Sequence, residues 1–137
     1  MSISPRNLWP EDIAVNEVVA PVAILKDQAS LLGERTKNLV EGRVTQREHH
    51  FHEPDFVYDF YLVAPALNNY RYRLFSISHD VQFYPLAIEE GGVSDLNGRD
   101  SQFQVSNEEE FLEALATMFS SERTKGIISS LIAQSRS

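Results

Sequence analysis

The sequence contains no cysteine, so a disulfide, a thiolate metal site and a cysteine nucleophile are all excluded. It also contains no apolar run of about 18 residues, which is the length that a membrane-spanning helix needs. Its first residues lack the shorter apolar run that is typical of a signal peptide. These features predict a cytoplasmic protein that has no membrane partner.

Basic residues are scarce in one part of the chain. The formal net charge is −8, and the segment 80–113 contains nine acidic residues but only one base, Arg99. The remaining residues contain eleven acids and eleven bases, so the whole net charge lies in this segment. Nucleic-acid binding requires clustered Lys and Arg, and we therefore expect no nucleic-acid partner.

The rest of the composition fits one domain spanning residues 1–137, of which 42% are hydrophobic. Residues 1–17 contain two prolines and no periodic pattern, which predicts an extended arm, and Trp9 is expected to dock this arm on the body. A helix is predicted over 21–36, because Pro21 suits a first helical turn. The apolar residues of this helix recur at helical spacing, and further side chains widen the stripe: Val22, Leu25, Ala29 and Leu32, then Ile24, Gln28 and Leu31.

The segment 39–105 predicts an antiparallel sheet, with strands over 39–47, 56–63, 70–78 and 81–88 and a short fifth strand over 102–105. The strand 56–63 is apolar on both faces, which indicates a central position. Asp59 is expected to pair with Arg71 or Arg73 across a hairpin. Pro85 lies inside the predicted fourth strand, which favours a sheet edge or a bulge there. The segment 89–101, with Gly91 and Gly92, is expected to form a loop.

Residues 107–135 predict two helices. Ser106 and Glu109 form a capping box for the first of them, and Ser120 or Ser121 caps the second. The sequence therefore predicts an α+β fold: an antiparallel meander sheet of four to five strands, preceded by one helix and followed by two C-terminal helices.

The four histidines occur in two places, one in each of two strand connections. In a simple meander these connections lie at the same end of the sheet, so the histidines and nearby carboxylates converge. Imidazole and carboxylate groups are zinc ligands, and a divalent metal is the one cofactor that this pattern allows. A bound metal could activate water for hydrolysis. The alternative is an ordinary polar hairpin end, and no His-Glu-x-x-His motif supports the metal. The candidate residues are His49, His50, His52, Glu53, Asp55, His79 and Asp80.

The acidic segment is the second candidate site, because it could offer a negative surface to a partner protein with a basic surface. The alternative is that these acids only keep the protein in solution. The candidate residues are Glu89, Glu90, Asp95, Glu108, Glu109, Glu110 and Glu113.

No nucleophile elbow and no phosphate-binding glycine loop is present, so the sequence favours binding over catalysis. We expect a small non-catalytic interaction or binding protein. The alternative is a metal-dependent hydrolase or a small-ligand-binding domain that uses the histidine-rich end of the sheet. A homodimer, formed through the sheet or the C-terminal helices, is compatible with either function.

Overall fold

The computed structural model describes residues 6–13, 18–48, 54–94 and 100–137. It has one N-terminal helix, a five-stranded antiparallel sheet and two C-terminal helices, which confirms the predicted α+β arrangement. The elements are, in chain order, α1 (Pro21–Arg35), β1 (Glu41–Gln46), β2 (Phe56–Ala64), a 3-10 turn (Pro65–Leu67), β3 (Tyr70–His79), β4 (Leu86–Ser94), β5 (Asp100–Val105), α2 (Glu108–Phe119) and α3 (Glu122–Ser135).

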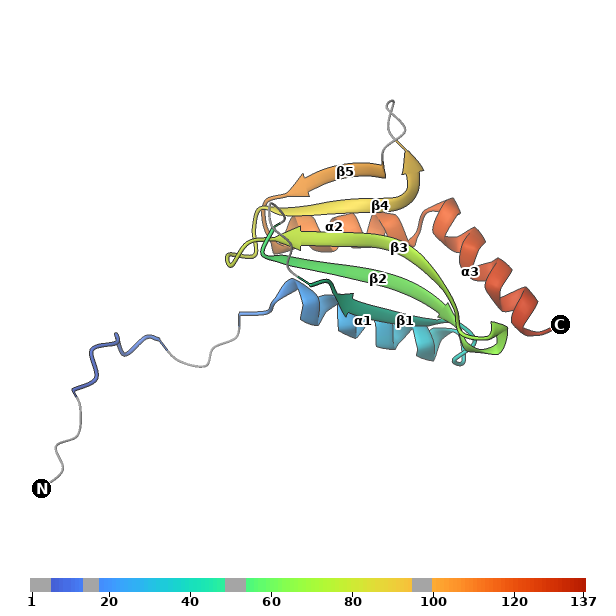
Figure 1. Cartoon of the computed structure of the whole chain (residues 1–137), viewed down its shortest axis with the longest axis horizontal. Helices are drawn as coiled ribbons and strands as arrows, with labels where there is room; N and C mark the ends of the chain where they lie inside the picture. Colours follow the sequence, from blue (N-terminus) through green and yellow to red (C-terminus); the bar gives the residue numbers. More distant parts are fainter. Residues whose placement is uncertain (1–5, 14–17, 49–53, 95–99) are drawn as a thin grey trace, which may run out of the picture.

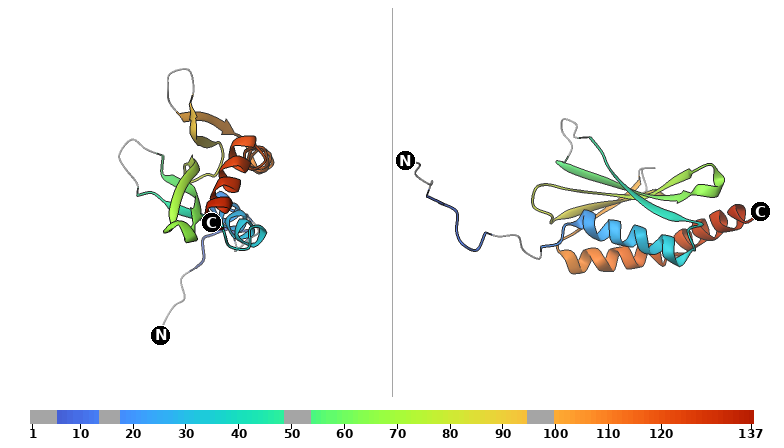
Figure 2. Two further views of the ribbon diagram at one scale, coloured as in Figure 1. Left: turned by 90° about the vertical axis from the view of Figure 1, so that its right-hand side faces the viewer. Right: turned by 90° about the horizontal axis from the view of Figure 1, so that it is seen from below.

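The sheet is a meander in which each strand pairs with its neighbours in the sequence, in the order β1-β2-β3-β4-β5. All three helices lie on one side of this sheet, which we call the covered face (Figures 1 and 2). The opposite side is the uncovered face. Helices α1 and α2 begin at the same end of the sheet and run in the same direction (Figure 1). In the described part of the chain, no helix combines the length and the apolar character that crossing a bilayer requires.

The core lies between the sheet and the helices. Phe60 of β2 stacks on Phe75 of β3 with ring centroids 5.1 Å apart, and both rings contact Phe119 of α2. Both strand phenylalanines are almost completely buried. Stacked and tilted aromatic pairs at these separations stabilise a core beyond the area that they bury.

Helix α1 packs closely against β1 because Gly42 has no side chain. A Cβ atom at Gly42 would lie 2.5 Å from the Cα atom of Ala29, closer than two carbon atoms can approach. The helix begins at Pro21 as predicted. After its end, the Thr36 hydroxyl donates to the Val40 carbonyl and accepts from the Val40 amide, which secures the turn into β1.

The fourth strand, β4, differs from the prediction in its residue bounds and in its place in the strand order. It begins at Leu86, directly after Pro85, because proline has no N–H to donate to the ladder. It lies between β3 and β5, so the expected edge position is wrong. It continues through Gly91 and Gly92, where a loop was predicted. A Cβ atom at Gly91 would lie 2.7 Å from the Arg73 carbonyl oxygen, so glycine allows the strands to approach closely there.

Two local predictions are also corrected. The N-cap of α2 is Asn107, whose side chain accepts from the Glu110 amide, so the cap lies one residue later than predicted. Glu110 in turn accepts from the Ser106 amide. Trp9 does not dock on the body: 74% of its surface is exposed, and residues 6–13 lie away from the sheet (Figure 1).

Candidate functional site

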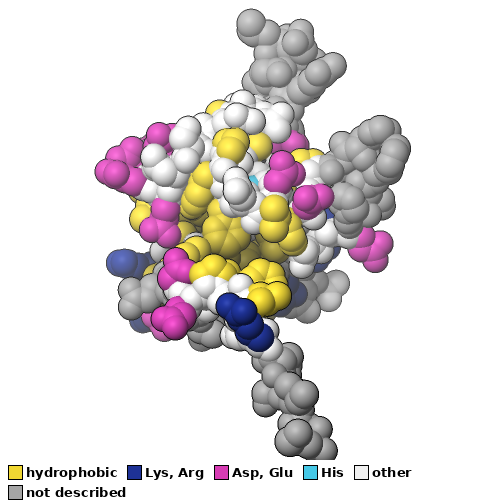
Figure 3. Space-filling model, turned by 90° about the vertical axis from the view of Figure 1, so that its left-hand side faces the viewer, with side chains coloured by type: hydrophobic (Ala, Val, Ile, Leu, Met, Phe, Trp, Pro, Cys, Tyr) yellow, Lys and Arg dark blue, Asp and Glu magenta, His cyan; other side chains and the backbone are white. Residues whose placement is uncertain are grey.

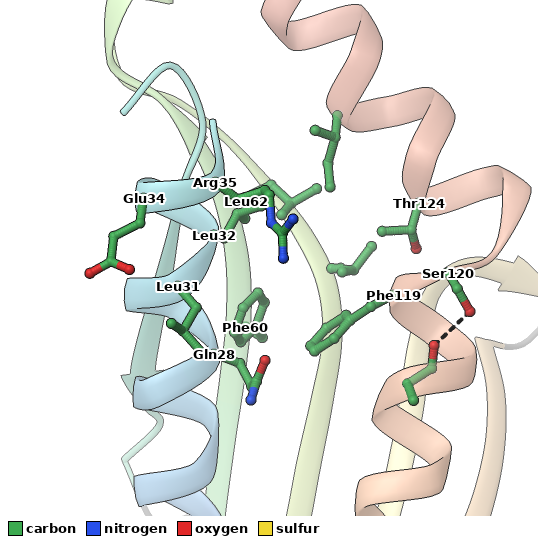
Figure 4. Close-up of a pocket in the computed structure, with 13 residues that line it drawn as sticks. Gln28, Leu31, Leu32, Glu34, Arg35, Phe60, Leu62, Phe119, Ser120 and Thr124 are labelled. Atoms are coloured by element: carbon green, nitrogen blue, oxygen red, sulfur yellow. Dashed lines mark hydrogen bonds between the residues drawn. The ribbon is translucent and has the colours of Figure 1, made fainter. Parts of the chain in front are cut away.

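Among the described residues, one of two cavities of equal volume is a groove on the covered face, between α1 on one side and α2 and α3 on the other. Its volume is about 690 Å³. The three helices do not close over the centre of the sheet, so side chains of the inner strands β2 and β3 form the floor of the groove (Figure 4). Helix α1 packs closely on the edge strand β1 at Gly42, so it lies over one edge of the sheet.

The floor of the groove is apolar. Phe60 and Leu62 come from β2, Leu74 comes from β3, and Phe119 of α2 contacts Phe60 beside the cavity (Figure 4). The register between β2 and β3 shifts between Phe60 and Tyr61, so Leu74 has no partner residue in the ladder. Neighbouring residues of a strand ordinarily point to opposite faces. Because of this irregularity, Leu74 and Phe75 are both buried in the core, and Leu74 contributes to the floor of the groove.

The walls of the groove carry a few polar groups. Arg35, at the end of α1, points into the cavity, whereas Glu34 points away from it (Figure 4). On the other wall, Ser120 donates its hydroxyl hydrogen to the Ala116 carbonyl, and Thr124 hydrogen-bonds to Ser121. In the described part of the chain, Arg35 has no ion-pair partner. The guanidinium group is therefore the strongest unneutralised charge that faces the cavity.

The groove surface of α2 continues toward its first turn. Ala116 and Ser120 line the cavity, and Glu109, Leu112 and Glu113 precede them at spacings of three and four residues, which places all five on one helix face. Leu112 is 44% exposed, and both glutamates are exposed. Figure 3 looks along the helices from this end and shows hydrophobic side chains gathered around a hollow, with acidic side chains at its sides.

The uncovered face of the sheet has a different chemistry. Asp59 is only 4% exposed there, and Arg47 binds its carboxylate through Nε and Nη2 at 2.8 and 2.7 Å. The Ser76 hydroxyl also donates to Asp59, and Arg73 lies 3.9 Å from it. Burial by itself raises the pKa of Asp59, but the hydrogen bonds from Arg47 and Ser76 and the nearby guanidinium charges outweigh burial and hold the pKa below 3.8. The predicted pairing of Asp59 with Arg73 is thus found, within a larger ionic network.

The histidine-rich end can be described only in part, because His49, His50, His52 and Glu53 lie outside the described residues. His79 is 6% exposed and packs between Phe56 and Phe83, with ring centroids 5.5 and 5.6 Å away. Asp55 and Asp80 are exposed. Among the described residues, no group of three potential metal ligands comes together. The metal site therefore stays a prediction that depends on residues 49–53.

Two buried polar atoms at this end have no hydrogen-bond partner in the described part of the chain: His79 Nε2 and the Tyr84 hydroxyl. The Asp80 carbonyl lies 2.7 Å from His79 Nδ1, and a carbonyl can only accept, so Nδ1 bears a proton and, in the neutral ring, Nε2 is an acceptor. Burial and the charge of Glu108 raise the pKa of Tyr84, so its hydroxyl remains protonated at neutral pH.

The described acidic candidates of the segment 80–113 lie on both sides of the sheet. Glu89 of β4 lies on the uncovered face, 3.8 Å from Arg73, and Glu90 is half-buried on the same strand. Asp95 lies outside the described residues. The remaining candidates are exposed on the first two turns of α2, on the covered side: Glu108, Glu109, Glu110 and Glu113. Of these, Glu109 and Glu113 lie on the face of α2 that also carries the groove-lining Ala116 and Ser120.

Sequence reasoning did not predict the groove, although one signal pointed to it. The apolar stripes of α1 and α2 are wider than one packing surface requires, and Leu31 and Leu112 remain 51% and 44% exposed after the helices pack. No family model matches the chain, and no curated protein and no solved structure is significantly similar to it. Its function must therefore be inferred from the groove, the ionic network and the histidine-rich end.

Proposed function

We propose that the protein is a non-catalytic binding protein, and that it holds a partner protein in the groove between α1 and α2–α3. The observation that supports this function most directly is a cavity of about 690 Å³ between the helices, whose apolar lining includes the exposed Leu31 and the only partly buried Phe119 and Ile128. Apolar surface in a groove with polar walls is the usual form of a protein or ligand interaction site.

The sides of the groove support the same function. Leu31 of α1 and Leu112 of α2 are the two large apolar side chains of the described helices that remain most exposed. Leu31 lines the groove, and Leu112 lies one turn before the groove-lining Ala116 on the same face of α2. Glu109 and Glu113 are exposed on the same face of α2 as Leu112. A partner that covers both leucines would bury apolar area at about 25 cal/mol per Å² and would meet a local negative charge. The acidic segment thus contributes to binding through α2, where it adjoins apolar surface.

The test is site-specific photocrosslinking in the native cells, with the full chain. A benzophenone amino acid replaces Leu31 or Leu112 at the groove, and in a matched control it replaces Gln104, an exposed residue of β5 on the uncovered face. We expect a covalent adduct with another protein at positions 31 and 112, and none at 104. When the irradiation is repeated in a lysate, the yield of the adduct should fall at 1 M salt, where exposed charges are screened over about 3 Å.

Two outcomes would contradict the proposed function. Adducts at position 104 alone would place the binding surface on the other side of the sheet. Adducts at none of the three positions, from a chain that melts at the same temperature as the unmodified protein, would remove the partner altogether.

One observation favours a second function, ligand or metal binding at the histidine-rich end. His79 presents a buried, unpartnered acceptor at Nε2, and its other nitrogen donates to a backbone carbonyl, as metal-bound histidines commonly do. Zinc titration of the purified protein tests this function, with His79→Gln as the variant. Stoichiometric binding that the variant loses would support it, and the absence of stoichiometric binding to the wild type would refute it.

A further inference from the structure

The backbone groups around the groove restrict what can bind in it. Its floor is formed by β2 and β3, which pair with neighbouring strands on both sides. Its walls are helices, whose backbone groups are bonded within the helix. The groove therefore has no strand edge to which an incoming chain could add.

An extended peptide in this groove would bury amide and carbonyl groups against apolar side chains without partners. Each such group costs a few kcal/mol when it is left unpaired. A helix satisfies its own backbone and exposes only side chains, so it enters such a groove without that cost. The lining of α1 from Gln28 to Arg35 spans two helical turns, about 10 Å, which matches apolar anchors at positions i, i+3 or i+4, and i+7 of a partner helix.

The charges around the groove differ at its two ends. Glu109 and Glu113 lie near the start of α2, and we call this the acidic end. Arg35 lies at the end of α1 and points into the cavity, and we call this the arginine end. Because α1 and α2 run in the same direction, these charges stand at opposite ends of the groove (Figure 1). On the order of three helical turns separate them, given 1.5 Å per residue.

From these observations we infer that the occupant is an amphipathic helix of a partner protein, with Lys or Arg at the acidic end and a carboxylate at the arginine end. This inference rests on the proposed function and specifies the class of partner. The carboxylate neutralises the guanidinium group of Arg35, and the basic side chains face Glu109 and Glu113. The apolar stripe of the partner covers Leu31, Leu112 and the floor between them.

Synthetic helical peptides of eighteen residues, labelled with a fluorophore, test the inference by anisotropy with the full chain. All share one apolar stripe, and they differ in the charges at their two ends: lysine and glutamate, lysine at both, or glutamate at both. A fourth peptide has the composition of the first but a scrambled stripe. We expect the lysine–glutamate peptide to bind most tightly, about tenfold more tightly than the peptide with glutamate at both ends. The scrambled peptide should not bind.

Substitution of the arginine end provides the decisive comparison. In Arg35→Glu, the order of the first two peptides should reverse, so that lysine at both ends becomes the preferred sequence. Arg43→Glu is the matched control, because Arg43 is an exposed residue of β1 on the uncovered face and its substitution changes the net charge equally. This control should change both affinities less than twofold. Circular dichroism melting verifies that both variants are folded.

Several results would overturn the inference. Equal binding of the scrambled peptide would show attraction by charge alone, and equal effects of Arg35→Glu and Arg43→Glu would show that Arg35 does not face the occupant. A dimer that Leu31→Asp dissociates, detected by light scattering, would identify a second copy of the chain as the occupant. If no peptide binds although photocrosslinking at positions 31 and 112 yields a partner, the helical class is wrong and the proposed function stands. If both experiments fail, both proposals fall.

Discussion

The two faces of the sheet differ in which kind of side chain is buried and which is left exposed. On the covered face, Phe60 and Phe75 are almost completely buried under the three helices, yet apolar side chains at the groove, such as Leu31, stay exposed. On the uncovered face, no described helix shields the strands, yet Asp59 is almost completely buried within its own network of arginines and Ser76. The covered side therefore keeps exposed apolar side chains on its helices, whereas the uncovered face has a buried charge that its neighbours neutralise.

This difference indicates where a partner can bind. A charged group gains little from a new partner when its charge is already neutralised at short distance, as that of Asp59 is by Arg47. Exposed apolar surface, by contrast, gains from any cover that removes it from water. Binding at the groove should therefore release more free energy than binding at the ionic network, although the network contains more charged side chains.

The largest expected effect is the loss of an aromatic ring from the covered face. Phe60→Ala removes the ring that contacts both Phe75 and Phe119, and we expect it to lower the free energy of unfolding by about 3–5 kcal/mol. Tyr61→Ala is the matched variant, because it changes the adjacent residue, which faces the other side and stacks on Arg71. It should cost about 1 kcal/mol. Urea denaturation measures both, and equal losses would contradict the assigned faces.

The next effect concerns the contact that holds α1 at the sheet edge. In Gly42→Ala, the new methyl group meets the backbone of Ala29, so the helix must shift, and we expect a loss of about 1–3 kcal/mol. Gly126→Ala is the matched variant in the exposed face of α3, where a Cβ atom meets nothing within 4 Å. It should instead stabilise the protein by about 0.5–1 kcal/mol, because alanine is the better helix former. Thermal melting distinguishes the opposite signs.

The order of elements could be predicted because each has a strong local signal. Pro21 marks the start of α1, and β2 contains a dense run of aromatic and β-branched residues. The position of β4 could not be predicted in the same way. The pair Gly91-Gly92 is typical of a loop in isolation, and it belongs to a strand because the backbone of β3 approaches it closely. That contact joins residues far apart in the sequence, so no local pattern contains it.

The groove was beyond sequence reasoning for a similar reason. The stripes of α1 and α2 indicate which side chains are apolar, but the gap between the helices depends on how close α1 comes to β1 and on the irregularity at Leu74.

The exposure of Trp9 was also unpredictable, because composition cannot distinguish a docked arm from an extended one. For the histidines, the meander placed His79 beside the connection to β2, but its aromatic surroundings depend on strand register.

On the uncovered face, Asp59→Asn should cost about 1–2 kcal/mol at neutral pH, because Arg47 loses a charged partner that it binds through two nitrogens. The effect should depend on pH. The pKa of Asp59 is lower in the folded state than its ordinary value of 3.8, so its contribution is complete well above that value and is lost as the pH falls through the folded-state pKa.

Urea denaturation of the wild type and Asp59→Asn at pH 7, and again well below pH 3.8, measures this dependence. The two proteins should differ at the higher pH and converge at the lower one. A difference that persists unchanged in acid would mean that Asp59 acts through packing and not through its charge.

The smallest effect is expected at the border of the ionic network. Glu89 lies 3.8 Å from Arg73, and both side chains are partly exposed, so water screens the pair. Glu89→Gln should therefore cost no more than about 0.5 kcal/mol, and the cost should vanish in 1 M salt. A loss above about 1 kcal/mol that survives high salt would show that Glu89 positions Arg73 toward Asp59. The ionic network of the uncovered face would then extend cooperatively from Asp59 to Glu89, instead of being a buried ion pair with weak neighbours. The two faces would differ in how rigidly their side chains are held as well as in charge.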